Sequence, residues 1–127
     1  MTDNDTQDQT FDVQAFAREI HEALVLGLLR EGPKHGYQIA LELAERSDGM
    51  FRLKHGTLYP ILHRLETDGR IAGSWTEDRR PRKVYRLTAA GGRWLVEQRE
   101  RCKAVFHGLF RIIDGEAGDE RASRTVA

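Results

Sequence analysis

Cysteine is nearly absent from this sequence, which has one in 127 residues. A single thiol, Cys102, can form neither an internal disulfide nor a zinc site built on cysteines. This excludes the small secreted folds that disulfides hold together. The five histidines, at positions 21, 35, 55, 63 and 107, are scattered, and no two have the i, i+4 spacing of a helical metal site. We therefore expect no metal and no cofactor.

Long hydrophobic runs are absent too. The longest, residues 23–29, contains Gly27 and is far shorter than the roughly 18 residues that a membrane-spanning helix needs. The first nine residues are acidic and polar, which is the reverse of a secretory signal peptide. The sequence has no glycine-rich phosphate loop and no nucleophile motif. These absences predict a soluble, cytoplasmic protein that contacts no membrane and is not an enzyme.

The chain also lacks net charge, because 20 basic residues balance 20 acidic ones. The balance hides an uneven distribution: residues 1–22 have a net charge of −5, and residues 52–101 have a net charge of +6. Within the basic region, Arg79, Arg80, Arg82 and Lys83 fall in five consecutive positions. On charge alone, such a run is more often a solvated loop than a binding site, and both interpretations stay open.

The hydrophobic pattern predicts one small domain that is mainly helical. Residues 1–12 have no periodicity and are predicted to form a disordered acidic tail. From Val13 the spacing predicts a first helix, which Gly32-Pro33 ends. A second amphipathic segment runs from about residue 35 to residue 46 and stops at a Ser-Asp-Gly break. The apolar face of the first helix is predicted to comprise Phe16, Ile20, Ala23, Leu24, Gly27 and Leu28.

A third helix has the clearest pattern. Its leucines and isoleucine, at positions 58, 61, 62 and 65, recur at i, i+3, i+4 and i+7, and Gly69 predicts its end. Thr57 is the predicted N-cap, which places Pro60 in the first turn, where its missing N–H costs no hydrogen bond. A helix that began near Lys54 would instead bend at Pro60. We predict the later start.

Two strand-like runs follow, residues 71–76 and 84–88, and a charged connector that contains Pro81 joins them. The connector is typical of an extended hairpin loop. Trp75 and Tyr85 are predicted to serve core and cross-strand packing. Thr88 then caps a long helix that runs to about residue 113, and residues 115–127 form a predicted flexible tail.

This order of elements predicts a winged helix-turn-helix domain over residues 13–88, followed by a C-terminal dimerisation helix over residues 89–114. The fold class is therefore mainly α with a small β-hairpin. A helix fits the major groove of DNA, and a projecting basic loop reaches phosphates or the minor groove.

The last helix would be about 39 Å long at 1.5 Å per residue, so a small domain leaves much of its apolar surface uncovered. We expect a second copy to cover it; the alternative is that the helix folds back on its own domain. The predicted dimerisation residues are Phe16, Ile20, Leu95, Cys102, Val105, Phe106, Leu109, Ile112 and Ile113.

Three stretches resemble the PadR family of bacterial transcription regulators: HGYQI from His35, GTLYPILHRLE from Gly56 and RPRKVYRLTAAG from Arg80. The matches run in order over residues 24–95, and the single long C-terminal helix is similar to the smaller subtype of the family. The resemblance implies a homodimeric winged-helix repressor. Such a repressor binds a pseudo-palindromic operator in double-stranded DNA and is released by a small ligand or a stress signal.

Residue by residue, the resemblance places the third helix and the hairpin loop on DNA. Gly56 would allow the sharp entry into the recognition helix, and Tyr37 would lie near the DNA backbone. The acidic N-terminal extension and Val84 depart from the family pattern. The predicted DNA-binding residues are Tyr37, Lys54, Gly56, Thr57, Tyr59, Pro60, His63, Arg64, Arg79, Arg80, Arg82 and Lys83.

Several assignments have structural alternatives. Tyr37 either lies on DNA or packs against the third helix. Trp94 either lines a pocket for a small aromatic or hydrophobic effector or packs between the hairpin and the first helix. Cys102 is predicted to lie buried at the dimer seam and not to act as a redox sensor. The alternative function is a winged-helix module that docks its basic loop on an acidic protein.

Overall fold

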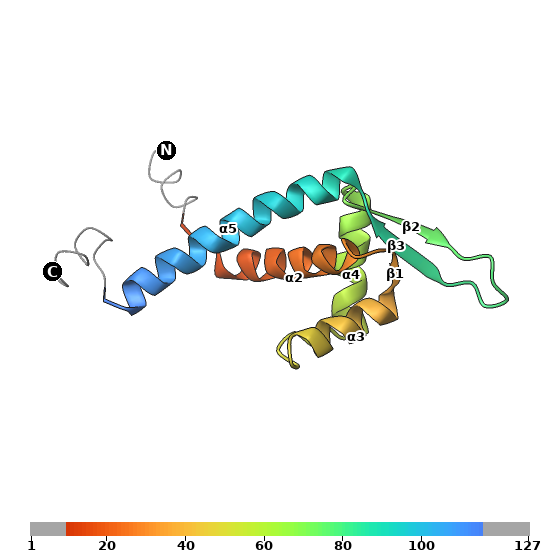
Figure 1. Cartoon of the computed structure of the whole chain (residues 1–127), viewed down its shortest axis with the longest axis horizontal. Helices are drawn as coiled ribbons and strands as arrows, with labels where there is room; N and C mark the ends of the chain where they lie inside the picture. Colours follow the sequence, from red (N-terminus) through yellow and green to blue (C-terminus); the bar gives the residue numbers. More distant parts are fainter. Residues whose placement is uncertain (1–9, 116–127) are drawn as a thin grey trace.

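Two long helices, two shorter ones and a three-stranded sheet make up the computed structural model, which describes residues 10–115 (Figure 1). The predicted tails, residues 1–12 and 115–127, lie almost entirely outside this range. The order is α2 (Val13–Leu29), β1 (Lys34–His35), α3 (Gly36–Arg46), α4 (His55–Thr67), β2 (Ile71–Trp75), β3 (Lys83–Leu87) and α5 (Ala89–Ile113). None of these helices has the length and apolarity to cross a membrane.

Helix α2 begins and ends close to its predicted limits. The side chain of Asp12 caps it by accepting a hydrogen bond from the backbone N–H of Ala15 at 3.1 Å. The predicted apolar face is wrong in one respect. The core buries Val25, Leu26 and Leu29, whereas Ala23, Leu24 and Gly27 line a groove beside α5. Residues 23–29 are apolar all round, so one face of α2 packs on the core and another faces the second helix.

Helix α4 begins earlier than predicted. Lys54 is its N-cap, and the Lys54 carbonyl accepts hydrogen bonds from the N–H groups of Thr57 and Leu58 at 2.9 and 2.8 Å. Thr57 therefore lies inside the helix, and its assignment as the N-cap was wrong. The hydrogen bond that Pro60 cannot donate would reach the carbonyl of Gly56, in the exposed first turn. Its loss is compatible with a helix whose other face buries four large side chains, at positions 58, 61, 62 and 65.

The sheet contains the predicted hairpin and a further short strand. Strands β2 and β3 pair antiparallel, with Ile71 opposite Leu87 and Trp75 opposite Lys83. The short strand β1 pairs with the other edge of β3, placing Lys34 opposite Tyr85, and the strand order is β1-β3-β2. Tyr85 is buried as predicted. The packing role predicted for Trp75 is wrong: this side chain is 65% exposed, because β2 ends beyond the helices that cover the sheet.

Helix α5 is fixed to the base of the hairpin. The Thr88 hydroxyl oxygen accepts from the N–H of Gly91 at 3.0 Å and donates to the carbonyl of Gly69 at 2.6 Å, so the predicted cap also ties α5 to the end of α4. Beyond this point α5 runs beside α2 and continues past its start, while the β2–β3 loop projects from the opposite end of the molecule (Figure 1).

The close approach at the start of α5 predicts opposite effects at two adjacent glycines. A Cβ on Gly91 would overlap the carbonyl oxygen of Arg70, whereas a Cβ on Gly92 would meet only the Leu87 side chain, at 3.9 Å. We expect Gly91→Ala to lower the free energy of unfolding by about 1–3 kcal/mol through overpacking. Gly92→Ala is the matched control and should raise it, by up to about 1 kcal/mol, through helix propensity. Urea unfolding of both variants at one protein concentration checks this; equal midpoints would contradict it.

Candidate nucleic-acid interface

The outer face of α4 is polar and exposed. Leu58, Ile61, Leu62 and Leu65 occupy the inner face and are at most 4% exposed. This leaves the other side of the helix free to meet a partner. Of the predicted DNA-binding residues in α4, the exposed ones are Gly56, Thr57, Tyr59, Pro60 and His63.

Tyr59 has its position set by two neighbours. Its ring stacks on that of His55 with centroids 5.5 Å apart. Its hydroxyl oxygen would lie only 2.7 Å from a Cβ placed on Gly36. The absence of a side chain at Gly36 thus lets the first turn of α3 approach the outer face of α4. His55 was not among the predicted site residues; its i, i+4 spacing from Tyr59 is the signal that could have indicated it.

Residues of α3, α4 and the hairpin line a common hollow of about 420 Å³. Tyr37 is 69% exposed at its edge, so the alternative in which this side chain packs against α4 is not the one the structure shows. Trp75, for which the sequence predicted a packing role, lies here with its ring exposed. The lining residues are His35, Gly36, Tyr37, Tyr59, Trp75, Arg82, Lys83 and Tyr85.

The hairpin loop carries the basic run away from the rest of the molecule. Thr76 and Arg82 continue the strand pairing through two hydrogen bonds, Thr76 N–H to the Arg82 carbonyl at 2.9 Å and Arg82 N–H to the Thr76 hydroxyl at 3.0 Å. Arg79, Arg80 and Arg82 are exposed at and beside the tip of the loop. Their guanidinium groups therefore face solvent, as a phosphate-binding loop requires.

Two of the predicted DNA-binding residues are already engaged in ion pairs. Lys83 donates from Nζ to Glu66 Oε1 at 2.9 Å, and this hydrogen bond raises the pKa of the Lys83 ammonium. Arg64 donates from Nε to Glu22 Oε2 at 2.7 Å. Both cations remain partly exposed, with 29% and 41% of their side-chain surface accessible. The sequence could not indicate these pairs, because the partners lie 17 and 42 residues apart.

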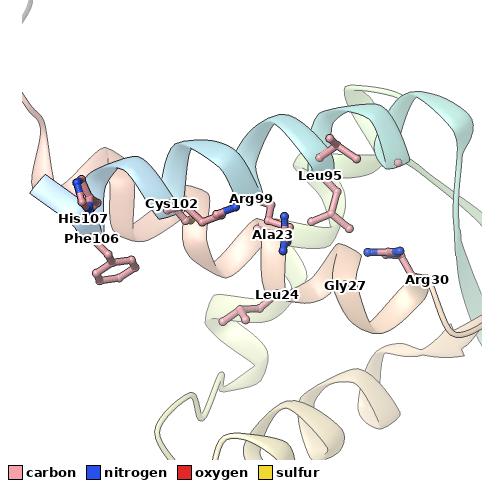
Figure 2. Close-up of a pocket in the computed structure, with 12 residues that line it drawn as sticks. Ala23, Leu24, Gly27, Arg30, Leu95, Arg99, Cys102, Phe106 and His107 are labelled. Carbon is pink, nitrogen blue, oxygen red and sulfur yellow. The ribbon is translucent and has the colours of Figure 1, made fainter.

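A second candidate surface is the groove between α2 and α5 (Figure 2). It encloses about 880 Å³, with an apolar floor and basic groups along its rim. Cys102 lies half-buried in it, and burial raises the pKa of this thiol. Its lining residues are Ala23, Leu24, Gly27, Arg30, Gly92, Leu95, Val96, Arg99, Cys102, Lys103, Phe106 and His107.

Trp94 does not line this groove. It packs against the core with the Arg70 guanidinium 4.3 Å from its ring centroid, at the junction of the hairpin and α5. Two of the predicted dimerisation residues, Phe16 and Leu95, are buried within one chain at 6% and 9% exposure. No three histidine, cysteine or carboxylate side chains in residues 10–115 come together as a metal site would require.

The family model described as "Transcriptional regulator PadR-like family" matches residues 25–97, from the last turn of α2 to the first turns of α5. The chain belongs to this PadR-like family. Its resemblance to PadR proteins, inferred from three motifs, is thereby confirmed. A PadR-family regulator from Eggerthella lenta superimposes with a TM-score of 0.71 at 30% identity, over 91% of this chain and 97% of that one. The winged-helix fold class is confirmed by such neighbours.

Two further relatives carry functional names. Transcriptional regulator Rv3488 of Mycobacterium tuberculosis is 36% identical over 88 residues, which are 68% of this chain and 79% of that protein. The structure of Bacillus subtilis PadR in complex with operator DNA superimposes with a TM-score of 0.57 at 31% identity. That match covers 61% of this PadR-like chain and 45% of the B. subtilis chain.

The environment of Cys102 predicts that this thiol reacts slowly with alkylating reagents. Its raised pKa and partial burial leave little accessible thiolate at neutral pH. We expect iodoacetamide to alkylate Cys102 at pH 7.5 several-fold more slowly in the folded protein than in the same protein unfolded in urea. Mass spectrometry of timed samples measures both rates. Equal rates would contradict the prediction and return a redox role to consideration.

Proposed function

We propose that this protein is a sequence-specific DNA-binding transcriptional regulator that acts as a homodimer on a pseudo-palindromic operator. The observation that carries the proposal is the common surface of α4, the start of α3 and the basic hairpin, which meet at the hollow that Tyr37 and Trp75 help to line. Membership of the PadR-like family supports it, as does the solved complex of B. subtilis PadR with operator DNA. A regulator of this kind works in the cytoplasm, where the bacterial chromosome lies.

On DNA, α4 enters the major groove with its exposed face toward the base edges. Tyr59 and His63 then read bases, while the hairpin loop with Arg79, Arg80 and Arg82 lies on phosphates or in the adjacent minor groove. The net charge of +6 over residues 52–101 supplies the long-range attraction.

The proposed dimer interface lies at the C-terminal end of α5. Phe106, Leu109, Phe110, Ile112 and Ile113 are 44–79% exposed, so one helix end presents five large apolar side chains to water. Burying each is worth about 1.5–3 kcal/mol, which favours association with a second copy. Two-fold symmetry then sets the two recognition helices about 34–36 Å apart, in successive major grooves.

Repression is the direction of control that we propose, and the B. subtilis relative named "Negative transcriptional regulator PadR", 33% identical over 78 residues, supports it. A small hydrophobic effector would find the apolar floor of the α2–α5 groove more suitable than Trp94, whose ring Arg70 covers.

The hairpin predicts a fall in affinity that is independent of DNA sequence. We expect Arg79→Ala/Arg80→Ala to weaken binding to a duplex selected from a random library and to an unselected duplex by similar factors. The slope of log K against log salt should become shallower by about 0.9 for each phosphate that the variant no longer binds. Arg18→Ala/Arg93→Ala removes two exposed arginines on α2 and α5 and serves as the matched control. Fluorescence anisotropy at several salt concentrations measures both effects.

The same assay separates DNA binding from docking on an acidic protein. Failure of the native protein to enrich any sequence, or an unchanged salt slope in the hairpin variant, would contradict the proposed function. Substitution of Tyr59 or His63 should instead change which sequence is selected.

The exposed apolar side chains at the C-terminal end of α5 predict that the protein is a dimer in solution. We expect the native protein to sediment as a dimer at micromolar concentration and Leu109→Glu/Ile112→Glu to sediment as a monomer, because each carboxylate would be buried without a partner. Met50→Glu is the control, since Met50 is as exposed as Ile112, 76% against 79%, but lies in the loop after α3. A monomeric native protein, or a dimeric double variant, would rule out this interface.

A further inference from the structure

An ion pair between a buried carboxylate of α2 and a partly exposed arginine joins α2 to the recognition helix α4. The Glu22 side chain is 7% exposed and that of Arg64 is 41% exposed, and the Arg64 Nε donates to Glu22 Oε2 at 2.7 Å. No other hydrogen bond or ion pair engages the Arg64 side chain within residues 10–115. Among the described residues, the two Nη groups of the guanidinium thus have no hydrogen-bond or ion-pair partner.

The burial of Glu22 has no explanation in the core itself. Glu22 precedes the core residues Val25 and Leu26 on α2, and it is the only buried carboxylate among the described residues. A buried ionised group is costly unless a counter-charge compensates it, and an apolar side chain at the same place usually serves stability equally well. The carboxylate thus has a role connected with Arg64 more than with packing.

The geometry limits what that role is. An arginine side chain has several rotatable bonds, and an exposed one samples many orientations on a helix surface. Holding Nε fixes the plane of the guanidinium, since Nε and both Nη groups are coplanar. Glu22 can impose this orientation because the core holds α2 rigidly, through neighbours that are fully buried.

We propose that Glu22 is a positioning residue for DNA discrimination: it fixes the guanidinium of Arg64 so that its Nη groups meet the phosphate backbone only when α4 lies in the register of the operator. This inference rests on the proposed function. A fixed donor pair fits one arrangement of phosphates, whereas a free arginine follows the backbone of any duplex.

The test compares affinities for a duplex selected from a random library by the native protein and for an unselected duplex of equal length. The discrimination ratio is the dissociation constant of the unselected duplex divided by that of the selected one. Glu22→Gln keeps the size and an acceptor oxygen but removes the charge. We expect the ratio to fall about tenfold, with weaker binding of the selected duplex and unchanged binding of the unselected one.

The control is Glu19→Gln, one turn earlier on the same helix. Glu19 accepts a hydrogen bond from Arg101 of α5 at 2.9 Å, so this variant breaks a similar, more exposed pair, with Glu19 29% exposed, that does not involve α4. We expect its ratio to equal that of the native protein. Thermal unfolding of both variants reports any general decrease in stability.

A double-mutant cycle identifies the group through which Glu22 acts. Arg64→Gln should lower the ratio and make the salt slope shallower by about 0.9 per protomer, whereas Glu22→Gln should leave the slope unchanged. In the Arg64→Gln background, Glu22→Gln should change the ratio no further. Arg64→Lys, which keeps the charge without the planar fork, should keep the slope and lower the ratio; it also tests orientation if Glu22→Gln fails to fold.

Three results would overturn the inference: a ratio for Glu22→Gln equal to that for Glu19→Gln, an equal effect of Glu22→Gln with and without Arg64, or native discrimination by Arg64→Lys. In each case the native protein still selects a sequence, and the proposed function stands. If the native protein selects none, the proposed function fails and the inference fails with it.

Discussion

The burial of α2 on more than one face is the constraint on which the other elements depend. One face, with Val25, Leu26 and Leu29, closes the core over α3 and α4, and another lines the groove beside α5. A helical segment that is apolar nearly all round, as residues 23–29 are, has no low-energy position at a protein surface. Helices α4 and α5 are consequently placed against a common element, although they lie far apart in sequence.

Patterns within a single element were the part of the fold that the sequence could predict. The start of α2, the cap of α5 at Thr88 and the stop of α4 at Gly69 all depend on neighbours in the chain. The start of α4 was predicted wrongly because the capping preference of threonine and the position of proline both favoured a later one. Strand β1 has two residues, too few for any periodicity to show.

The candidate site was predictable by residue type but not by arrangement. Motif resemblance indicated the α4 face and the basic hairpin, and the structure places them on one surface. The exposure of Trp75 depends on where the covering helices end, and the engagement of Arg64 by Glu22 depends on how α2 and α4 cross. Neither is visible in local spacing. The neutral total charge was similarly uninformative, since the basic region only becomes a surface once the hairpin projects from the domain.

The junction at Gly91 has a consequence for the geometry of the proposed dimer. The start of α5 lies directly against the backbone of Arg70, and the Thr88 hydroxyl donates a hydrogen bond to the Gly69 carbonyl, so the hairpin and α5 are joined closely at one place. In the proposed dimer, a change in how two copies of α5 cross would swing both hairpins and both recognition helices together. The number of base pairs between half-sites would thus depend on the crossing of α5, while the bases bound within each half-site would depend on the surface of α4. Half-site spacing and half-site sequence would then be determined by different parts of the chain.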